Sequence, residues 1–197
     1  AYELMDDAPQ DWDAWIGLPV ELGYKRIGVL GHSLGATKTI YYFGNQDDER
    51  VKLAICLSPP RLSYSAFQRD ADGPEFNTYV ATAKERLDAG DPRGLIDAAL
   101  PVPFLGSAAT YYDKYGPEEH VNILTHLPNV KLPLLAIHGT LEPAAELPMR
   151  GVLEELTALG DELPNFTYAI MQDGDHFYTG QRPLAWTVIR DWLKKQA

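Results

Sequence analysis

The chain has 197 residues, with 17 Lys and Arg against 28 Asp and Glu, so its formal net charge is −11. Hydrophobic residues make up 45% of it and aromatic residues 11%, which is enough for one sizeable core and excludes a disordered or fibrous protein. The negative charge disfavours nucleic acid and anionic lipid surfaces as partners, because both would repel it.

Cys56 is the single cysteine, so no disulfide can form within the chain. Its apolar neighbours Ile55 and Leu57 predict a small core residue, and a lone buried thiol favours a reducing cytosol. No apolar run approaches the roughly 20 residues that a membrane-spanning helix needs. Residues 1–10 do not resemble a signal peptide either, so we expect a cytoplasmic protein without a membrane span.

Short apolar segments alternate with longer segments of helical period, which predicts an α/β fold with a parallel sheet covered by helices on both faces. The apolar segments are rich in Val, Ile and Leu, as buried parallel strands are. Four such strands are expected, at 26–30, 53–57, 132–137 and 166–171.

A first helix is expected ahead of the sheet, capped by Asp11 and distorted by Gly17 and Pro19. Its apolar residues are predicted to share one face: Trp12, Trp15, Ile16 and Leu22. Gly44 and Gly160 are expected to end two further helices, and Pro183 to lie in the first turn of the last one. These three helices are predicted at 34–43, 149–159 and 184–193.

Between Pro59 and Leu127, prolines and glycines separate short helical segments, and no strand is expected. One helix there ends at Gly90, and Pro92 starts another. The helix that ends at Gly90 has an apolar face of Phe76, Tyr79, Val80, Ala83 and Leu87. A later helix passes through Tyr111, Tyr112 and Tyr115. The predicted organisation is a core formed by 1–60 and 128–197, with a helical lid insertion at 61–127.

The segment Gly31-His32-Ser33-Leu34-Gly35 lies directly between an expected strand and an expected helix. A Gly-x-Ser-x-Gly turn in this context lifts the serine hydroxyl above the sheet, while the glycines leave room for close packing of strand and helix. We therefore predict that Ser33 is a nucleophile rather than an ordinary turn residue.

A serine hydroxyl is a poor nucleophile until a base removes its proton, so a histidine must reach the same edge of the sheet. The chain has five histidines: His32, His120, His126, His138 and His176. His176 follows the last expected strand and precedes a helix that starts with proline, which projects it over the carboxyl end of the sheet. We predict His176 as the base and interpret His138 as a packed or hydrogen-bonded residue at a strand end.

A third residue, a carboxylate that orients the histidine, is expected between Ser33 and His176 in the chain. Glu142 follows the third strand and fits this order, although a glutamate at a helix N-terminus is also favoured by the helix dipole alone. Asp173 and Asp175 are the alternatives. However, the side chain of a residue so close to His176 in the chain would have difficulty folding back to contact the imidazole ring.

The sequence predicts neither a metal nor a cofactor. It has no paired cysteines, no His-Glu-x-x-His, no phosphate-binding loop and no Gly-x-Gly-x-x-Gly before a helix. Asp173, Asp175 and His176 could together bind a metal ion, but the triad explains the same histidine more simply.

These residues together resemble an α/β-hydrolase. The resemblance is carried by Gly-His-Ser-Leu-Gly at 31–35, Leu-Leu-Ala-Ile-His-Gly at 134–139 with Glu142 after it, and Gly-Asp-His at 174–176. It implies a serine esterase, lipase or thioesterase that acts on a small-molecule ester, with the insertion as its lid. It covers only the C-terminal half of that fold, from the nucleophile strand onward, so the fold here lacks the N-terminal strands.

The resemblance also implies an oxyanion hole, for which the backbone N–H of Leu34 provides one donor. The family takes a second donor from a glycine-containing loop early in the chain, and no such loop is visible here. We expect that a preceding segment has been removed, that a partner supplies the donor, or that another group replaces it. The first strand would then have an open edge, which predicts pairing with another part of a longer chain or with a second subunit.

Two functions remain open at this stage. The first is a serine hydrolase that cleaves an ester or thioester with an apolar acyl part. The second is a hydrolase-like binding or structural module that keeps the triad residues but has little activity on its own.

Overall fold

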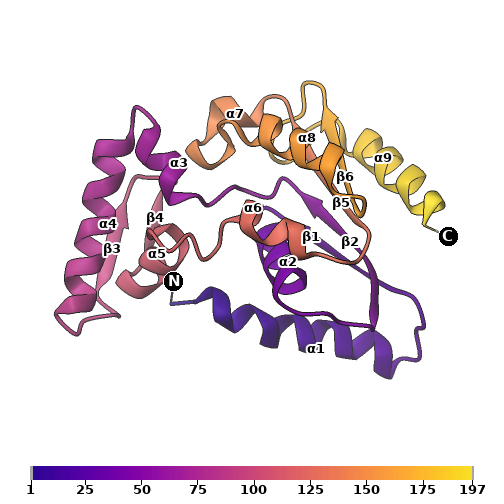
Figure 1. The fold of residues 1–197 in the computed structure, drawn as a ribbon, viewed down its shortest axis with the longest axis horizontal. Helices are drawn as coiled ribbons and strands as arrows, with labels where there is room; N and C mark the ends of the chain where they lie inside the picture. Colours follow the sequence, from indigo (N-terminus) through magenta and orange to yellow (C-terminus); the bar gives the residue numbers. More distant parts are fainter. Residues whose placement is uncertain (1, 197) are drawn as a thin grey trace.

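The computed structural model describes residues 2–196, and Ala1 and Ala197 lie outside the described residues. Four parallel strands form a sheet in the order β1-β2-β5-β6 (Figure 1). Their bounds are β1 (Ile27–His32), β2 (Val51–Leu57), β5 (Leu134–Gly139) and β6 (Phe166–Met171). All four predicted strands are confirmed, with ends shifted by at most two residues. Because the strands are parallel, their carboxyl ends lie at one edge of the sheet.

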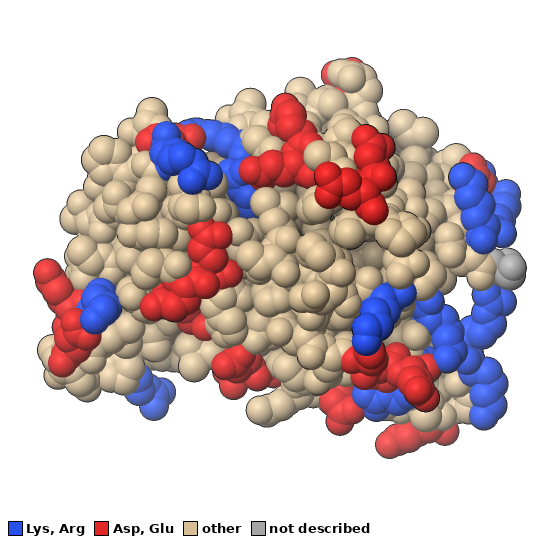
Figure 2. Space-filling view, in the orientation of Figure 1, with Lys and Arg blue, Asp and Glu red and all other residues tan. Residues whose placement is uncertain are grey.

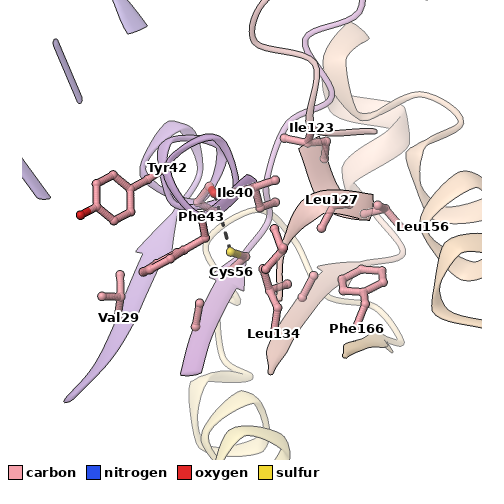
Figure 3. Close-up of a cluster of buried hydrophobic side chains, with 14 of the residues drawn as sticks. Val29, Ile40, Tyr42, Phe43, Cys56, Ile123, Leu127, Leu134, Leu156 and Phe166 are labelled. Carbon is pink, nitrogen blue, oxygen red and sulfur yellow. Dashed lines mark hydrogen bonds between the residues drawn. The ribbon is translucent and has the colours of Figure 1, made fainter. Parts of the chain in front are cut away.

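One face of the sheet is covered by α2 (Leu34–Asn45) and α8 (Val152–Glu162), and α1 (Ala8–Glu21) packs beside α2. Figure 3 shows the side chains of this core, where Ile40 and Phe43 of α2 meet Cys56 of β2. Cys56 is fully buried, and its thiol lies 3.6 Å from the carbonyl oxygen of Ala36. The cysteine is the small core residue that its neighbours predicted.

The opposite face is covered by the C-terminal helix α9 (Arg182–Lys195). Ile189 and Trp192 of this helix pack on Leu135 and Ile137 of β5. Helices therefore cover both faces, which confirms the predicted α/β architecture. Proline lies in the first turn of α9, as expected.

The first helix differs from its prediction. It begins at Ala8 rather than near Asp11, and it continues through Pro19. Ile16 is buried, but Trp15 is 69% exposed and Leu22 is 68% exposed. Trp15 lines a groove beside β1 together with Trp12 and Ile16 but leaves most of its surface open to solvent, and Leu22 lies beyond the last turn of the helix.

Gly44 and Gly160 do not end their helices, contrary to the prediction. A Cβ atom on Gly44 would lie 2.7 Å from the Cβ atom of His126, so the glycine permits close packing within α2. Gly160 lies within α8, where a Cβ atom would lie 3.4 Å from that of Tyr168. Close contact with His126 accounts for Gly44, whereas a Cβ atom at Gly160 would lie at an ordinary contact distance.

The insertion after β2 forms a separate lobe, at the left of Figure 1, with its own apolar cluster. Its helices are α3 (Tyr64–Arg69), α4 (Gly73–Asp88) and α5 (Ala108–Tyr115), whereas α6 (Ile123–His126), near the end of the insertion, packs against α2 in the core. The prediction of a helix after Pro92 is wrong. In that part of the chain, β3 (Leu95–Ala98) pairs antiparallel with β4 (Phe104–Ser107). Burial alternates along β3, so one side of the hairpin joins the cluster and the other faces solvent.

The remaining elements are a short helix α7 (Glu142–Ala145) and three 3₁₀ turns at Met5–Asp7, Leu127–Asn129 and Leu147–Met149. Figure 2 shows Asp and Glu spread over this face of the molecule, with the densest group of Lys and Arg at the right-hand end, beside the C-terminus. Within residues 2–196, none of the helices has the length and apolar character needed to cross a membrane.

β1 is an edge strand, because no strand within residues 2–196 pairs with its outer side. An apolar groove lies on each side of this edge. One groove is lined by Trp12 and Trp15 of α1, and the other by Leu53 of β2 and Leu193 of α9. The open edge of β1 agrees with the expectation from the sequence. Pairing of this edge with another part of a longer chain or with a second subunit stays a prediction.

Candidate active site

Ser33 lies at the sharp turn between β1 and α2. It has φ 55° and ψ −127°, a conformation that non-glycine residues rarely adopt. Its N–H donates to the carbonyl oxygen of Leu57 at 2.9 Å, which anchors the turn to β2. A Cβ atom on Gly31 would contact Gly35 O and lie 2.7 Å from Ala36 N, so only glycine lets the helix start against the strand. The strand, turn and helix occur in the predicted order.

The loops after β5 and β6 are packed against each other at the same edge of the sheet. The N–H of Leu141 donates to the carbonyl oxygen of Gly174 at 3.0 Å. A Cβ atom on Gly139 would lie 2.8 Å from the Cα atom of Gly174, so the two loops approach more closely than larger residues would allow. This contact brings Glu142, the first residue of α7, close to His176.

The three side chains singled out from the sequence form one line of hydrogen bonds. His176 Nε2 lies 3.0 Å from Ser33 Oγ, and His176 Nδ1 lies 2.9 Å from Glu142 Oε2. The Glu142 side chain is fully buried and that of His176 is 17% exposed. The buried end therefore holds the carboxylate, and the serine lies at the more accessible end.

The pKa shifts of the two titratable groups in this line favour a charged Glu142 beside a basic His176. Burial favours the neutral form of Glu142, but hydrogen bonds from His176, the Gly139 N–H and Ser58 outweigh it and hold the pKa of the carboxyl below its usual value. The hydrogen bond to Glu142 raises the pKa of His176, although burial acts in the opposite direction. His176 is therefore a stronger base than an isolated imidazole.

Ser58 and Tyr178, two residues that the sequence analysis missed, complete the surroundings of Glu142. Ser58 Oγ lies 2.9 Å from Glu142 Oε1 and 2.8 Å from the hydroxyl of Tyr178. Gly139 N–H donates to the same carboxylate oxygen at 2.6 Å. Ser58 directly follows an apolar strand, at the edge of the sheet that carries the site. A polar residue at this position in the sequence could have identified Ser58 as a candidate site residue.

The alternative acids do not take the place of Glu142. Asp175 Oδ1 accepts the N–H groups of Phe177 and Thr179 at 3.0 and 2.8 Å, so this carboxylate is held by its own loop. Asp173 Oδ1 accepts from the side chain of Gln172 and is exposed. The carboxylate that contacts the His176 ring is that of Glu142.

The other histidines lie in different environments. His138 is fully buried, and its Nε2 donates to the carbonyl oxygen of Pro59 at 3.1 Å. Burial lowers its pKa to about 4, so it is neutral and hydrogen-bonded, as interpreted from the sequence. His32 Nε2 lies 2.8 Å from the carbonyl oxygen of His176, which helps to hold the histidine loop. His120 and His126 contact Tyr41 on α2 instead of Ser33.

The structure resembles several solved structures, although no family model and no curated protein matches the sequence. The monoacylglycerol lipase of Paleococcus ferrophilus aligns with a TM-score of 0.69 at 18% identity, covering 100% of this chain and 77% of that one. A carboxylesterase of Nitrososphaera gargenis aligns with a TM-score of 0.55 at 14% identity, covering 99% and 73%. The α/β-hydrolase GrgF of Penicillium sp. sh18 aligns with a TM-score of 0.58 at 15% identity, covering 86% and 63%.

The chain has the α/β-hydrolase fold. It spans 63 to 77% of the length of these neighbours. In this α/β-hydrolase fold the ends of β1, β5 and β6 supply Ser33, Glu142 and His176. The N–H of Leu34 occupies the first position of α2, where an amide has no acceptor within its own helix and the helix dipole is positive.

Proposed function

We propose that the chain is a serine hydrolase that cleaves a carboxylic ester or thioester. The observation that carries the proposal is the unbroken line of hydrogen bonds from Ser33 through His176 to the buried Glu142. This arrangement supplies a nucleophile, a base and a group that orients the base, which together define catalysis by a serine triad. The lipase and carboxylesterase among the structural neighbours are consistent with this class.

In the proposed mechanism, Ser33 Oγ attacks the carbonyl carbon of the ester while His176 Nε2 takes the serine proton. Glu142 keeps the other proton of the ring on Nδ1 and stabilises the imidazolium that forms. The negative charge on the tetrahedral intermediate faces the N–H of Leu34. His176 then gives its proton to the departing alcohol or thiol, and a water molecule hydrolyses the acyl-serine by the same route in reverse. The mechanism needs only groups of this chain and water.

The proposed substrate is a small, uncharged ester with an apolar acyl part. Leu34, beside the nucleophile, packs against the apolar cluster of the insertion at 61–127, which we propose to be the lid. After the hydrogen bond to Glu142, the charge of Glu146 also raises the pKa of His176, so a second carboxylate lies near enough to act on the site. Together with the net charge of −11, this disfavours anionic substrates.

The second oxyanion donor determines how fast this chain works by itself. Loss of one such donor typically costs about 10² to 10³ in kcat. With Leu34 as the donor that the chain supplies beside Ser33, we propose that the 197-residue protein is a slow esterase.

The test combines a fluorophosphonate probe with hydrolysis of p-nitrophenyl butyrate. The probe requires an activated serine, so we expect it to label Ser33, identified by peptide mass spectrometry. Ser33→Ala should lose the labelling and reduce kcat by a factor of about 10³ or more, with an unchanged circular dichroism spectrum. Thr187→Ala removes an exposed hydroxyl of α9 and serves as the matched control.

The outcome separates the two functions that the sequence leaves open. Labelling at Ser33 together with ester turnover supports the hydrolase. An unlabelled wild-type protein without turnover supports a hydrolase-like binding or structural module. Equal turnover in Ser33→Ala and wild type would contradict the role of Ser33.

A further inference from the structure

Ser58 and Tyr178 form a buried chain of hydroxyl groups behind the carboxylate of Glu142. Ser58 is fully buried and Tyr178 is 4% exposed. Ser58 Oγ lies 2.9 Å from Glu142 Oε1 and 2.8 Å from the Tyr178 hydroxyl, which in turn lies 2.9 Å from the carbonyl oxygen of Ile137. The chain joins the ends of β2, β5 and β6 on the side of Glu142 that faces away from His176.

Each of these hydroxyl groups has one proton, and Glu142 fixes the direction of the hydrogen bond that it makes with Ser58. An ionised carboxylate only accepts, so Ser58 must donate to Glu142. The single proton of Tyr178 is shared between two contacts, one with Ser58 Oγ at 2.8 Å and one with the carbonyl oxygen of Ile137 at 2.9 Å. Ile137 can accept from Tyr178 as well as from the N–H of Ser58, because a carbonyl oxygen has two lone pairs. The direction from Ser58 to Glu142 is therefore fixed, and the Tyr178 hydroxyl holds Ser58 Oγ in place at 2.8 Å.

We infer that Ser58 and Tyr178 are positioning residues that keep Glu142 ionised and oriented toward His176. Ser58 and the N–H of Gly139 both donate to Oε1, so Oε2 is the oxygen left for His176 Nδ1. Donors on the charged form of a carboxylate stabilise that form. The role of these residues in turnover rests on the proposed function, whereas their effect on Glu142 does not.

The other titratable groups around Glu142 do not provide this hydrogen bond. His138 is neutral and donates its Nε2 proton to Pro59. Burial, followed by the charge of Glu142, raises the pKa of Tyr168, so that phenol stays protonated, and its ring packs against His138. Within residues 2–196, Ser58 is the side chain that donates to Glu142 Oε1.

The backbone of Ser58 makes a clean variant available. Its φ is 48°, in the left-handed region that glycine adopts without steric cost. Ser58→Gly therefore removes the hydroxyl and suits the backbone, so any loss can be assigned to the hydroxyl and not to strain. Tyr178→Phe removes the second hydroxyl and keeps the buried ring.

The experiment makes Ser58→Gly and Tyr178→Phe in the wild type and in a Glu142→Gln background. Carbon-13 NMR of labelled glutamate follows the carboxyl titration of Glu142, and p-nitrophenyl butyrate gives kcat and KM. In the wild-type background we expect Ser58→Gly to raise the pKa of Glu142 by about 1 and to lower kcat about tenfold, with KM changed less than twofold. In the Glu142→Gln background it should cause no further loss, because Ser58 acts through Glu142.

Tyr178→Phe should shift the same two quantities in the same direction by smaller amounts, because Ser58 can still donate. It also decides the question if Ser58→Gly fails to fold. An unchanged titration of Glu142 in the folded variants, or an equal loss of kcat in both backgrounds, would overturn the inference. If the wild type shows neither turnover nor labelling of Ser33, the proposed function fails, while the Glu142 titration still decides whether the hydroxyl chain holds this carboxylate ionised.

Discussion

Replacing Glu142 by glutamine tests the line of hydrogen bonds most directly, because it keeps the shape of the side chain and removes its charge. The N–H of Gly139 lies 2.6 Å from Oε1 and can only donate, so the amide oxygen must occupy that position. The amide NH₂ group then faces His176 Nδ1. A donor there forces the ring to accept at Nδ1 and to carry its proton on Nε2, 3.0 Å from Ser33 Oγ. The ring then has no lone pair for the serine proton.

The magnitude follows from this exchange of tautomers. A serine triad held in the wrong tautomer loses about 10⁴ in kcat with its geometry intact. Some of the molecules can recover by rotation of the amide, at the cost of the Gly139 hydrogen bond, so we expect a loss of about 10³ to 10⁴ for Glu142→Gln. Stability should change little, because the lost charge-assisted hydrogen bonds are offset by relief of the cost of burying a charge.

Hydrolysis of p-nitrophenyl butyrate, with protein folding checked by thermal unfolding, measures this effect. Asp175→Asn is the matched control, since Asp175 is held by the N–H groups of Phe177 and Thr179, and it should remain within about threefold of the wild type. A Glu142→Gln variant with more than a tenth of wild-type kcat would refute the reasoning. If Asp175→Asn suffered the large loss while Glu142→Gln stayed near the wild type, the acid role would move to Asp175.

Three further predictions follow from the same structure. Since Glu142 raises the pKa of His176, kcat/KM should fall as the pH drops through a midpoint above 6.5, and Glu142→Gln should move this midpoint down; equal midpoints in the two proteins would contradict the coupling. Gly31→Ala should destabilise the protein by about 2 to 3 kcal/mol in urea unfolding, because its methyl group would meet the backbone of α2, whereas Gly35→Ala has open space and should be tolerated. The open edge of β1 predicts that the isolated chain associates with a second copy, so size-exclusion chromatography should show a species larger than 21.9 kDa, and a stable monomer would show this wrong.

Much of the core could be predicted from the sequence because its signals are local. A buried parallel strand is a short run of Val, Ile and Leu, and each of the four runs forms a strand in the sheet. The turn at Ser33 needs glycine at position 31 for a steric reason that involves residues only four and five positions away. Both features can therefore be read without knowledge of distant contacts.

The predictions that failed depend on neighbours from elsewhere in the chain. Gly44 and Gly160 have the sequence pattern of helix ends, but α2 and α8 continue through them, and Gly44 packs closely against His126. The segment Leu95–Ala98 is too short for its period to distinguish a helix from a strand. It forms a strand because β4 pairs with it.

By itself, the sequence determined which four segments form the strands of the sheet, the turn that exposes Ser33, and the succession of a serine, an acid and a histidine at strand ends. These features follow from short-range sterics and from the burial of apolar runs. Only the tertiary structure decided which polar atoms meet. The contact between Glu142 and His176, and the hydrogen bonds from Ser58 and Tyr178 behind it, depend on distances between loops that lie 34 to 120 residues apart in the chain. Sequence spacing does not encode such distances, because they are set by how the sheet and its two packed loops bring separate strand ends together.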